Sequence, residues 1–444
     1  MESSFNLNLE KYANALSDVN VTHDIGKVTE VSGLLVKGYV TGCGIGSICE
    51  INTLIGHKKF LAEVVGFKGR DVLLMPLKET HGVGHGSKIS LLKTKATVQV
   101  GNELLGRIVN GLGEPIDGLG EIDTSEEVPL YQEAVGPMQR AIIDQPLSVG
   151  VRAIDGLITA GRGQRVGIMA GSGVGKSMLM GMMARSTEAD INVIALIGER
   201  GREVKEFIEH SLGEEGLKRS IVIAVTSDQS PLIRMRGAFV ATAIAEHFAA
   251  QGKSVLLVMD SVTRFAMAQR EIGLSAGEPP ASKGYTPSVF SLLPKLLERA
   301  GSFSNGGSIT GFYTVLVEGD DMDEPIADAV RSIVDGHIVL DRKIAHKGHF
   351  PAIDVLKSTS RVMRGVVSRQ HVQLAQMMRE NMATYQEAED LINIGAYRSG
   401  ANPKIDQAIQ FNERISEFLK QEVNEPSHLS TTVDYLASIM GGRQ

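Results

Sequence analysis

The stretch that decides the fold is Ala170-Gly-Ser-Gly-Val-Gly-Lys-Ser177, which follows an apolar run at Arg165–Met169. An apolar strand, a glycine-rich turn and a helical stretch in this order are the setting of a phosphate-binding P-loop. Glycines let successive main-chain N–H groups converge on a polyphosphate, and the following helix directs its positive dipole end at the same anion. Lys176 is expected to reach the outer phosphates, and the Ser177 hydroxyl to ligate Mg²⁺. The segment predicts a nucleoside triphosphate site built by Gly171, Ser172, Gly173, Val174, Gly175, Lys176 and Ser177.

A chance match and a dinucleotide-binding turn are the alternatives to a P-loop, and both are weaker. A chance match is favoured slightly by Ala170, which stands where the motif has glycine, but the flanking strand and helix argue against coincidence. A dinucleotide-binding turn is also rich in glycine, but its fingerprint has no Gly-Lys-Ser ending.

Composition indicates a soluble globular protein of 444 residues, with 43% hydrophobic and 22% charged residues. We expect neither a membrane span nor a secretory signal, and Cys43 and Cys49 cannot frame a disulfide scaffold. These features predict a cytoplasmic protein. The net charge of −7 argues against a nucleic-acid-binding surface.

The pattern of apolar, polar and glycine residues changes three times along the chain and predicts four segments. Residues 1–20 are expected to form a polar tail with a thin apolar stripe from Leu7 to Leu16. Short glycine-punctuated runs over residues 21–95 predict a small β-barrel. Residues 96–364 alternate apolar strands with helices, which predicts an α/β domain with a parallel sheet covered on both faces. Residues 365–444 predict a C-terminal helical domain.

The elements of the two larger segments follow from hydrophobic periodicity. Strands are predicted at Arg165–Met169, Asn192–Ile197, Ile221–Val225, Ser254–Asp260, Ser308–Leu316 and His337–Leu340. Helices of the central segment are predicted at Ser177–Arg185, Arg202–Ser211 and Leu232–Ala250, and C-terminal helices at Gln370–Arg379, Thr384–Ile394, Ile405–Lys420 and Thr431–Met440.

Hydrolysis requires more than a P-loop: a group that activates water, a second anchor for Mg²⁺ and a stabiliser of phosphoryl charge. Asp260 ends an apolar strand, and the carboxyl edge of a parallel sheet faces the nucleotide, so Asp260 is expected near the metal. Glu199 and Arg200 follow the second strand and are expected at the same edge. There the carboxylate would orient and partly deprotonate the attacking water, and the arginine would clamp phosphate. For Arg361, placed well past the predicted sheet, the residues alone favour a structural salt bridge over an arginine finger.

Several ordered segments, taken together with the P-loop, resemble the rotary and secretion ATPase family, in which a RecA-like domain is assembled into a hexamer. The segments are Gly198-Glu-Arg-Gly-Arg-Glu-Val204, Met259-Asp-Ser-Val-Thr-Arg-Phe-Ala266, Gly277-Glu-Pro-Pro280, Tyr285-Thr-Pro-Ser-Val-Phe290, Gly307-Ser-Ile-Thr-Gly-Phe-Tyr-Thr-Val315 and Ser360-Arg-Val362. Within this family, the segments 317–328, 335–341 and 394–400 resemble the flagellar protein export ATPases most. The injectisome ATPases of virulence type III secretion are near relatives and remain the alternative.

The resemblance implies a role for each matching residue, with ATP and Mg²⁺ as the ligands. Lys176 matches the phosphate-binding lysine and Ser177 the magnesium ligand. Glu199 matches the general base of catalytic subunits, and Asp260 the Walker B carboxylate. The other two matches are Arg361, which takes the place of an arginine that reaches across the subunit interface, and Phe350, which replaces a tyrosine that stacks on adenine. The match overturns the salt-bridge preference for Arg361, and phenylalanine keeps the π face that stacking requires.

The resemblance also implies partners and a location. The expected partners are further copies of the chain in a homohexamer, a stalk-like coiled-coil protein in its centre, a regulatory protein on the N-terminal tail, the membrane export gate, and exported proteins with their chaperones. The protein is expected in the cytoplasm and peripherally at the inner face of the cell membrane, without nucleic acid. If Arg361 completes a neighbour's site, the specific activity should rise with protein concentration.

Three competing functions are less favoured. A non-catalytic subunit of a rotary ATP synthase usually lacks the carboxylate that Glu199 provides. An RNA-translocating hexamer would require a basic surface with aromatic side chains, which the N-terminal segment lacks. A catalytic subunit of an ion-driven synthase is retained as a minor alternative.

Overall fold

The computed structural model describes residues 25–441, apart from residues 55, 57, 79, 80, 125, 318 and 320. The predicted tail of residues 1–20, with its stripe from Leu7 to Leu16, lies outside these ranges. The chain falls into two compact units that divide after Ala96, and each unit is described by itself. Within the described ranges, no helix combines the length and apolarity that crossing a bilayer requires.

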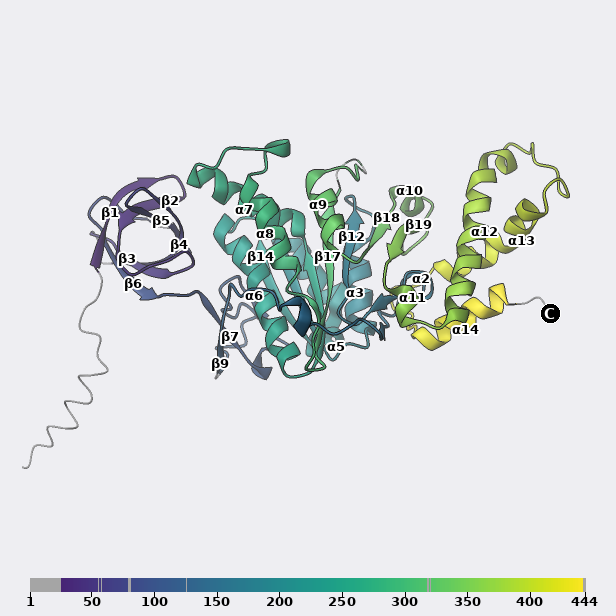
Figure 1. Cartoon of the computed structure of the whole chain (residues 1–444), viewed down its shortest axis with the longest axis horizontal. Coiled ribbons are helices and arrows are strands. Elements are labelled where there is room, and N and C mark those ends of the chain that lie inside the picture. Colours follow the sequence, from purple (N-terminus) through teal and green to yellow (C-terminus); the bar gives the residue numbers. More distant parts are fainter. Residues whose placement is uncertain are drawn as a thin grey trace, which may run out of the picture. The chain divides into compact units, whose positions relative to one another are not determined.

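The first unit is a closed β-barrel in which every neighbouring pair of strands is antiparallel. Side chains that alternate along the strands, among them Val36, Ile51 and Leu74, fill its interior. Figure 1 shows the strands curling into a ring. The barrel predicted from the glycine-punctuated runs is confirmed. Its strand order is β1 (Ile25–Ser32), β2 (Leu35–Tyr39), β5 (Asp71–Pro76), β4 (Lys59–Lys68), β3 (Ile48–Asn52) and β6 (Lys88–Lys93).

The second unit is built on a nine-stranded sheet whose central strands are parallel. All six predicted strands belong to it. The predictions missed the short strands β8 and β16 and the antiparallel edge strand β19. The order across the sheet is β19 (Ile353–Ser360), β18 (Gly336–Leu340), β12 (Arg165–Ala170), β17 (Ser308–Leu316), β15 (Ser254–Asp260), β13 (Ile191–Glu199), β14 (Ser220–Thr226) and β8 (Ile108–Val109), with β16 (Gly301–Ser302) beside β17.

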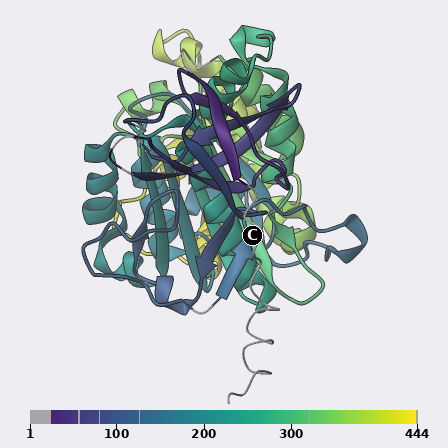
Figure 2. The same ribbon diagram turned by 90° about the vertical axis from the view of Figure 1, so that its left-hand side faces the viewer.

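Helices cover both faces of this sheet, as the continuous apolar strands require. Because side chains alternate across a strand, Leu196 joins the core that includes α3 (Lys176–Ser186), whereas Ile197 faces α6 (Pro231–Ala250). Figures 1 and 2 show helices on the two sides of the sheet. The remaining helices of this layer are α4 (Gly201–Glu206), α5 (Gly213–Lys218), α7 (Val262–Ala276), α8 (Pro287–Leu297), α9 (Pro325–Ile333), α10 (Arg342–His346) and α11 (Met363–Val366).

One predicted helix of the central segment is not regular. The predicted helical stretch Arg202–Ser211 is helical throughout, but its type changes where α4 gives way to a π-helical turn at Phe207–Leu212. Gly181 of α3 lies against this turn so closely that a methyl group there would meet the Ser211 carbonyl oxygen at 2.4 Å. Packing against α3 therefore accompanies the change of helix type.

Three helices end the chain: α12 (Arg369–Asn393), α13 (Pro403–Leu419) and α14 (Leu429–Met440). The two helices predicted at Gln370–Arg379 and Thr384–Ile394 are in fact the single helix α12. Residues 380–383, Glu-Asn-Met-Ala, contain no helix breaker, so the helix continues through them.

Arg152, at the start of the short helix α2 (Arg152–Leu157), anchors the C-terminal helices to the central layer. Its side chain is buried, its Nε donates to the Phe418 carbonyl at 2.9 Å, and its guanidinium pairs with Glu425. Gln421 adds two hydrogen bonds of 2.8 Å, from the Arg152 N–H and to the Gly150 carbonyl. A single buried cation thus holds segments that lie far apart in the sequence.

Candidate active site

The P-loop leaves β12 at Ala170 and ends where α3 begins at Lys176. Gly173 and Gly175 have φ values of 76° and 87°, a left-handed conformation that favours glycine. Together with Ser177, they line a cavity of about 480 Å³ at the carboxyl edge of the sheet. This volume lies in the range of small-molecule sites. The turn and the cavity occur where the octapeptide predicted them.

Two carboxylates from neighbouring parallel strands meet the P-loop lysine. Asp260 ends β15, is 2% exposed, and accepts hydrogen bonds from Thr314 Oγ1 at 2.6 Å and from Lys176 Nζ. Glu199 ends β13, and its Oε1 lies 3.8 Å from Lys176 Nζ. The register pairs Leu196 with Asp260, so Glu199 extends three residues further past the sheet edge. The structure therefore brings Lys176, Glu199 and Asp260 together as the sequence predicted.

Glu199 is in an unusual electrostatic environment. Burial, together with the nearby Asp260 carboxylate, raises the pKa of Glu199 to about 7. Its Oε1 is buried and has no hydrogen-bond partner within the described part of the chain. A carboxylate with a pKa near neutrality and a free acceptor atom in a cavity has the properties of a general base.

Two arginines that the sequence patterns did not single out also line the cavity: Arg264 and Arg342. Arg264 lies on α7, its stem packs against Gly198, and its Nε is buried without a partner in the described residues. Arg342 begins α10. The spacing of Arg264 after Asp260 was the available signal, because the first turn of a helix after such a strand lies at the same edge. For Arg342 the sequence held no signal, since its position depends on the packing of β18 and β19.

Three predicted residues differ in how they meet the cavity. Arg200 lines it, but its side chain is 80% exposed and lies 3.6 Å from Glu203. The Val174 side chain is buried in the core, so only its main chain is available to a ligand. The Phe350 ring lies beside the P-loop, because a methyl group added at Gly175 would be 3.4 Å from its Cδ1 and Cε1. This ring is 46% exposed.

Arg361 lies apart from the cavity of its own chain. It was expected well past the sheet, but it directly follows the edge strand β19, so that expectation was wrong. The register pairs Ser360 with Gly336 and Ala170 with Leu340, four residues further along β18. At about 3.3 Å per residue, Arg361 lies about 13 Å or more from the P-loop, toward the opposite sheet edge. The side chain is exposed.

The residues at the cavity fit a nucleotide polyphosphate with Mg²⁺. The turn leaves no Cβ at its glycines, Lys176 supplies a cation, and Arg264 offers an unpartnered donor. Ser177 and Asp260 provide oxygen atoms, the ligand type that Mg²⁺ prefers. Within the described ranges there is no cluster of three or more His, Cys, Asp or Glu side chains that could hold a metal. Mg²⁺ ordinarily keeps several waters and is bound through one or two carboxylates together with phosphate oxygens of the substrate.

Comparisons with known proteins identify the family of this chain. The chain is 54% identical to the flagellum-specific ATP synthase of Bacillus subtilis over 94% of its own length and 96% of the relative. It is 49% identical to the type 3 secretion system ATPase of Xanthomonas euvesicatoria, over 96% of each chain. The chain belongs to the family of flagellum-specific ATP synthases and type III secretion ATPases.

Family models and solved structures extend this result. The nucleotide-binding domain of the ATP synthase alpha/beta family matches residues 150–360, and the β-barrel domain of that family matches residues 28–92. The T3SS EscN ATPase C-terminal domain matches residues 367–438. The assembled ATPase EscN of enteropathogenic E. coli superposes with a TM-score of 0.87 at 45% identity, covering 94% of this chain and all of that chain. EscN in complex with its central stalk EscO gives 0.86 at the same identity and coverage. The predicted RecA-like core with a β-barrel and a helical domain is thus the family's architecture.

Proposed function

We propose that this chain hydrolyses ATP to power the export of flagellar proteins through a type III secretion apparatus. It is an ATPase of a family whose similar members bear the names of flagellum-specific ATP synthases and type III secretion ATPases. The observation that carries the enzymatic part is the buried Oε1 of Glu199, which has no hydrogen-bond partner among the described residues and forms an ion pair with the P-loop lysine at 3.8 Å. A subunit that only binds nucleotide does not need this carboxylate.

The residues of the cavity divide the chemistry among them. Lys176 and the main chain of residues 171–175 bind the phosphates, and Ser177 and Asp260 hold Mg²⁺. When bound, Mg²⁺ neutralises charge that develops on the phosphates. Glu199 orients the attacking water and accepts its proton. Phe350 stacks on the base, and Arg200 contributes a cation at the rim of the cavity.

Arg361 completes the site of a neighbouring protomer in a homohexamer. Its exposed side chain and its distance from the cavity of its own chain support this assignment, because within one protomer it cannot reach the phosphates. The similar protein EscN has been solved as an assembled ATPase and in complex with its central stalk EscO. We extend both features to this chain, as a ring with a stalk-like coiled-coil protein in its centre.

The remaining assignments follow the family. The regulatory protein on the tail, the export gate, the exported proteins and their chaperones are proposed partners. We place the protein in the cytoplasm, peripherally at the inner face of the membrane. We propose that the domain boundaries fall after residues 20, 95 and 364, as predicted from the sequence. Injectisome export is the second candidate, since the type 3 secretion system ATPase of Xanthomonas euvesicatoria is 49% identical to this chain.

The substitution Glu199→Gln tests the enzymatic assignment. The amide keeps the shape of the side chain but cannot accept the proton, so we expect ATP binding near the wild-type level and hydrolysis reduced at least about 10²-fold. Equilibrium binding of radiolabelled ATP and steady-state phosphate release measure the two quantities. Turnover near the wild-type level would show that another group is the base.

A further inference from the structure

Arg361 has a fixed main chain and a free side chain. Its N–H donates to the Asp335 carbonyl at 3.0 Å, and it follows directly on the last residue of β19. The guanidinium forms no ion pair with any residue in the described ranges. A cation that is anchored at its backbone and unpaired at its tip is suited to reach into another molecule.

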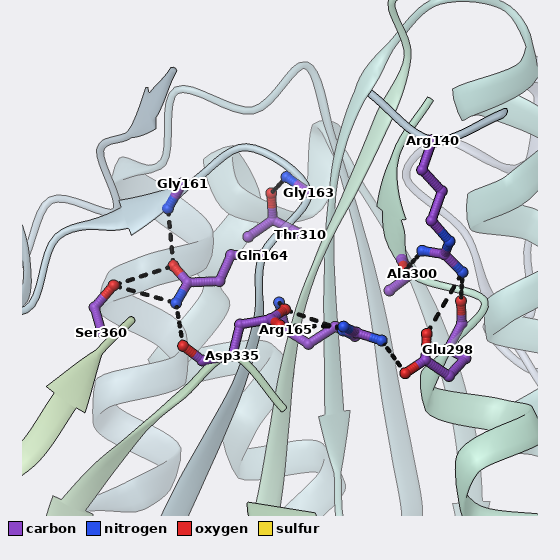
Figure 3. A network of polar contacts seen from close by, with 10 residues as sticks. All are labelled: Arg140, Gly161, Gly163, Gln164, Arg165, Glu298, Ala300, Thr310, Asp335 and Ser360. Carbon is purple, nitrogen blue, oxygen red and sulfur yellow. Dashed lines mark hydrogen bonds and ion pairs between the residues drawn. The ribbon is translucent and has the colours of Figure 1, made fainter. Parts of the chain in front are cut away.

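A buried glutamine, Gln164, binds both Asp335, which accepts from the Arg361 N–H, and Ser360, which precedes Arg361 in the chain. Gln164 is fully buried, and its Nε2 donates to the Asp335 carbonyl at 3.1 Å and to Ser360 Oγ at 3.2 Å. Its Oε1 accepts from the Gly161 N–H at 2.9 Å, and the Ser360 hydroxyl donates to the Thr159 carbonyl at 2.8 Å. Figure 3 shows Gln164 between Ser360 and Asp335. The Ser360 hydroxyl therefore fixes the position next to Arg361 by two separate contacts.

A chain of ion pairs fixes Asp335, the residue whose carbonyl accepts from the Arg361 N–H. Arg165 holds the Asp335 carboxylate with Nε at 3.0 Å and with a second guanidinium nitrogen at 3.1 Å. It also pairs with Glu298, which lies 3.6 Å from Arg140. Bidentate arginine–carboxylate pairs fix orientation as well as distance. In Figure 3 this chain runs from Asp335 across the sheet edge to Arg140.

We propose that Gln164, Arg165, Asp335 and Ser360 are positioning residues that aim Arg361 at the neighbouring protomer's phosphates. This inference rests on the proposed function, in which Arg361 acts across the interface. The four side chains fix the main chain before and opposite Arg361, so only the arginine's own rotamers remain free. Small errors in the placement of a catalytic group reduce turnover strongly, because the charge must meet the transition state at hydrogen-bond distance.

The variant Ser360→Ala tests the proposal, because it removes one hydroxyl from the network and leaves the strand intact. We expect kcat to fall about ten- to a hundredfold at saturating ATP and protein, with KM for ATP changed less than about twofold. Ser360→Thr keeps a hydroxyl in a β-branched side chain and should restore most of the rate. Thr242→Val is the matched control: it removes a buried hydroxyl that donates to the Ala238 carbonyl at 2.8 Å within α6, outside this network, and should leave kcat unchanged.

Rings assembled from two variants distinguish a misplaced Arg361 from damage to the variant's own cavity. Glu199→Gln protomers cannot hydrolyse ATP but carry an intact Arg361 and its network. Adding them to Ser360→Ala protomers before assembly should raise the rate above that of either variant alone, because they aim a well-placed arginine at an intact cavity. The Ser360→Ala protein and its mixture with Glu199→Gln protomers should both assemble to the same extent as the wild type, as measured by light scattering.

The outcomes that overturn the proposal are distinct. A Ser360→Ala protein that assembles with wild-type kcat, or one that assembles and that Glu199→Gln protomers fail to rescue, would each show that the network does not position Arg361. If Arg361→Ala were itself fully active, the proposed role of Arg361 across the interface would fail, whatever Ser360→Ala does. If Arg361→Ala were inactive and Ser360→Ala normal, only the positioning role would fail.

Discussion

If Glu199 is the proposed general base, its raised pKa should make the rate of ATP hydrolysis depend on pH near neutrality. A general base acts in its ionised form, and the pKa of Glu199 is about 7 because of burial and the nearby Asp260 carboxylate. The ionised fraction therefore rises from about one-tenth at pH 6 to about nine-tenths at pH 8, so kcat should increase close to tenfold over this range. Steady-state phosphate release at saturating Mg²⁺ and ATP, measured from pH 5.5 to 9, gives the midpoint.

Two variants assign this midpoint to Glu199 rather than to the phosphates of ATP. The protonated Glu199 carboxyl donates a hydrogen bond to Glu203, which raises the pKa of Glu199, so Glu203→Ala should move the midpoint to lower pH. The charge of Arg264 lowers that pKa, so Arg264→Gln should move the midpoint to higher pH. Titration of the nucleotide would give one midpoint for all three proteins. A rate that is flat between pH 6 and 8, or a midpoint that neither variant moves, would refute the role of Glu199 as the base.

The raised pKa of Glu199 also affects folding stability, but in the opposite direction to activity: stability falls as the pH rises. Because the folded protein holds the Glu199 proton more tightly than the unfolded chain, this carboxyl favours the folded state below pH 4.5, its ordinary pKa. That contribution is lost as the pH rises from 4.5 to about 7. The carboxylate is thus kept at the sheet edge at a cost in stability near neutral pH.

Two further predictions concern binding and folding. Phe350→Ala should weaken ATP binding by about 1–3 kcal/mol, whereas Phe350→Tyr should leave it near the wild-type level, as measured by fluorescence titration; equal affinity in the alanine variant would exclude stacking. Arg152→Met should lower the free energy of unfolding by about 2–3 kcal/mol, because it leaves the carbonyls of Phe418 and Lys420 without their donor. The exposed Arg202, paired with Glu206 at 2.7 Å, is the matched control, and its change to Met should cost at most about 1 kcal/mol. Denaturant unfolding that gave the two variants the same stability would contradict the anchoring role of Arg152.

Local sequence patterns were sufficient for the P-loop and for the strands that carry Glu199 and Asp260. Each of these strands is a continuous apolar run that ends in a carboxylate, and parallel strands place such ends at one edge. The position of Lys176 follows from the motif itself. These parts of the site depend on short segments and on one rule of topology, so they could be predicted.

The parts that could not be predicted depend on long-range packing. The strand β19 lies at the edge of the sheet and has one neighbour, so it can contain Lys357 and several hydroxyl residues. It therefore lacks the apolar run that identifies a central strand. For that reason Arg361 was expected far from the sheet rather than at its border. Arg342 reaches the cavity only through the fold of β18 and α10. The continuity of α12 was missed because the polar residues Glu380 and Asn381 interrupt its apolar face, although neither breaks a helix.

The central claim is that each active site is shared between two protomers, and mixing two inactive variants tests it most directly. Glu199→Gln lacks the base but keeps its arginine, and Arg361→Ala lacks the arginine but keeps its base, so each alone should hydrolyse little ATP at any protein concentration. In rings assembled at random from equal amounts, half of the cavities contain Glu199 and half of their neighbours supply Arg361, so about a quarter of the wild-type rate should return. A mixture as inactive as its components would contradict a shared site.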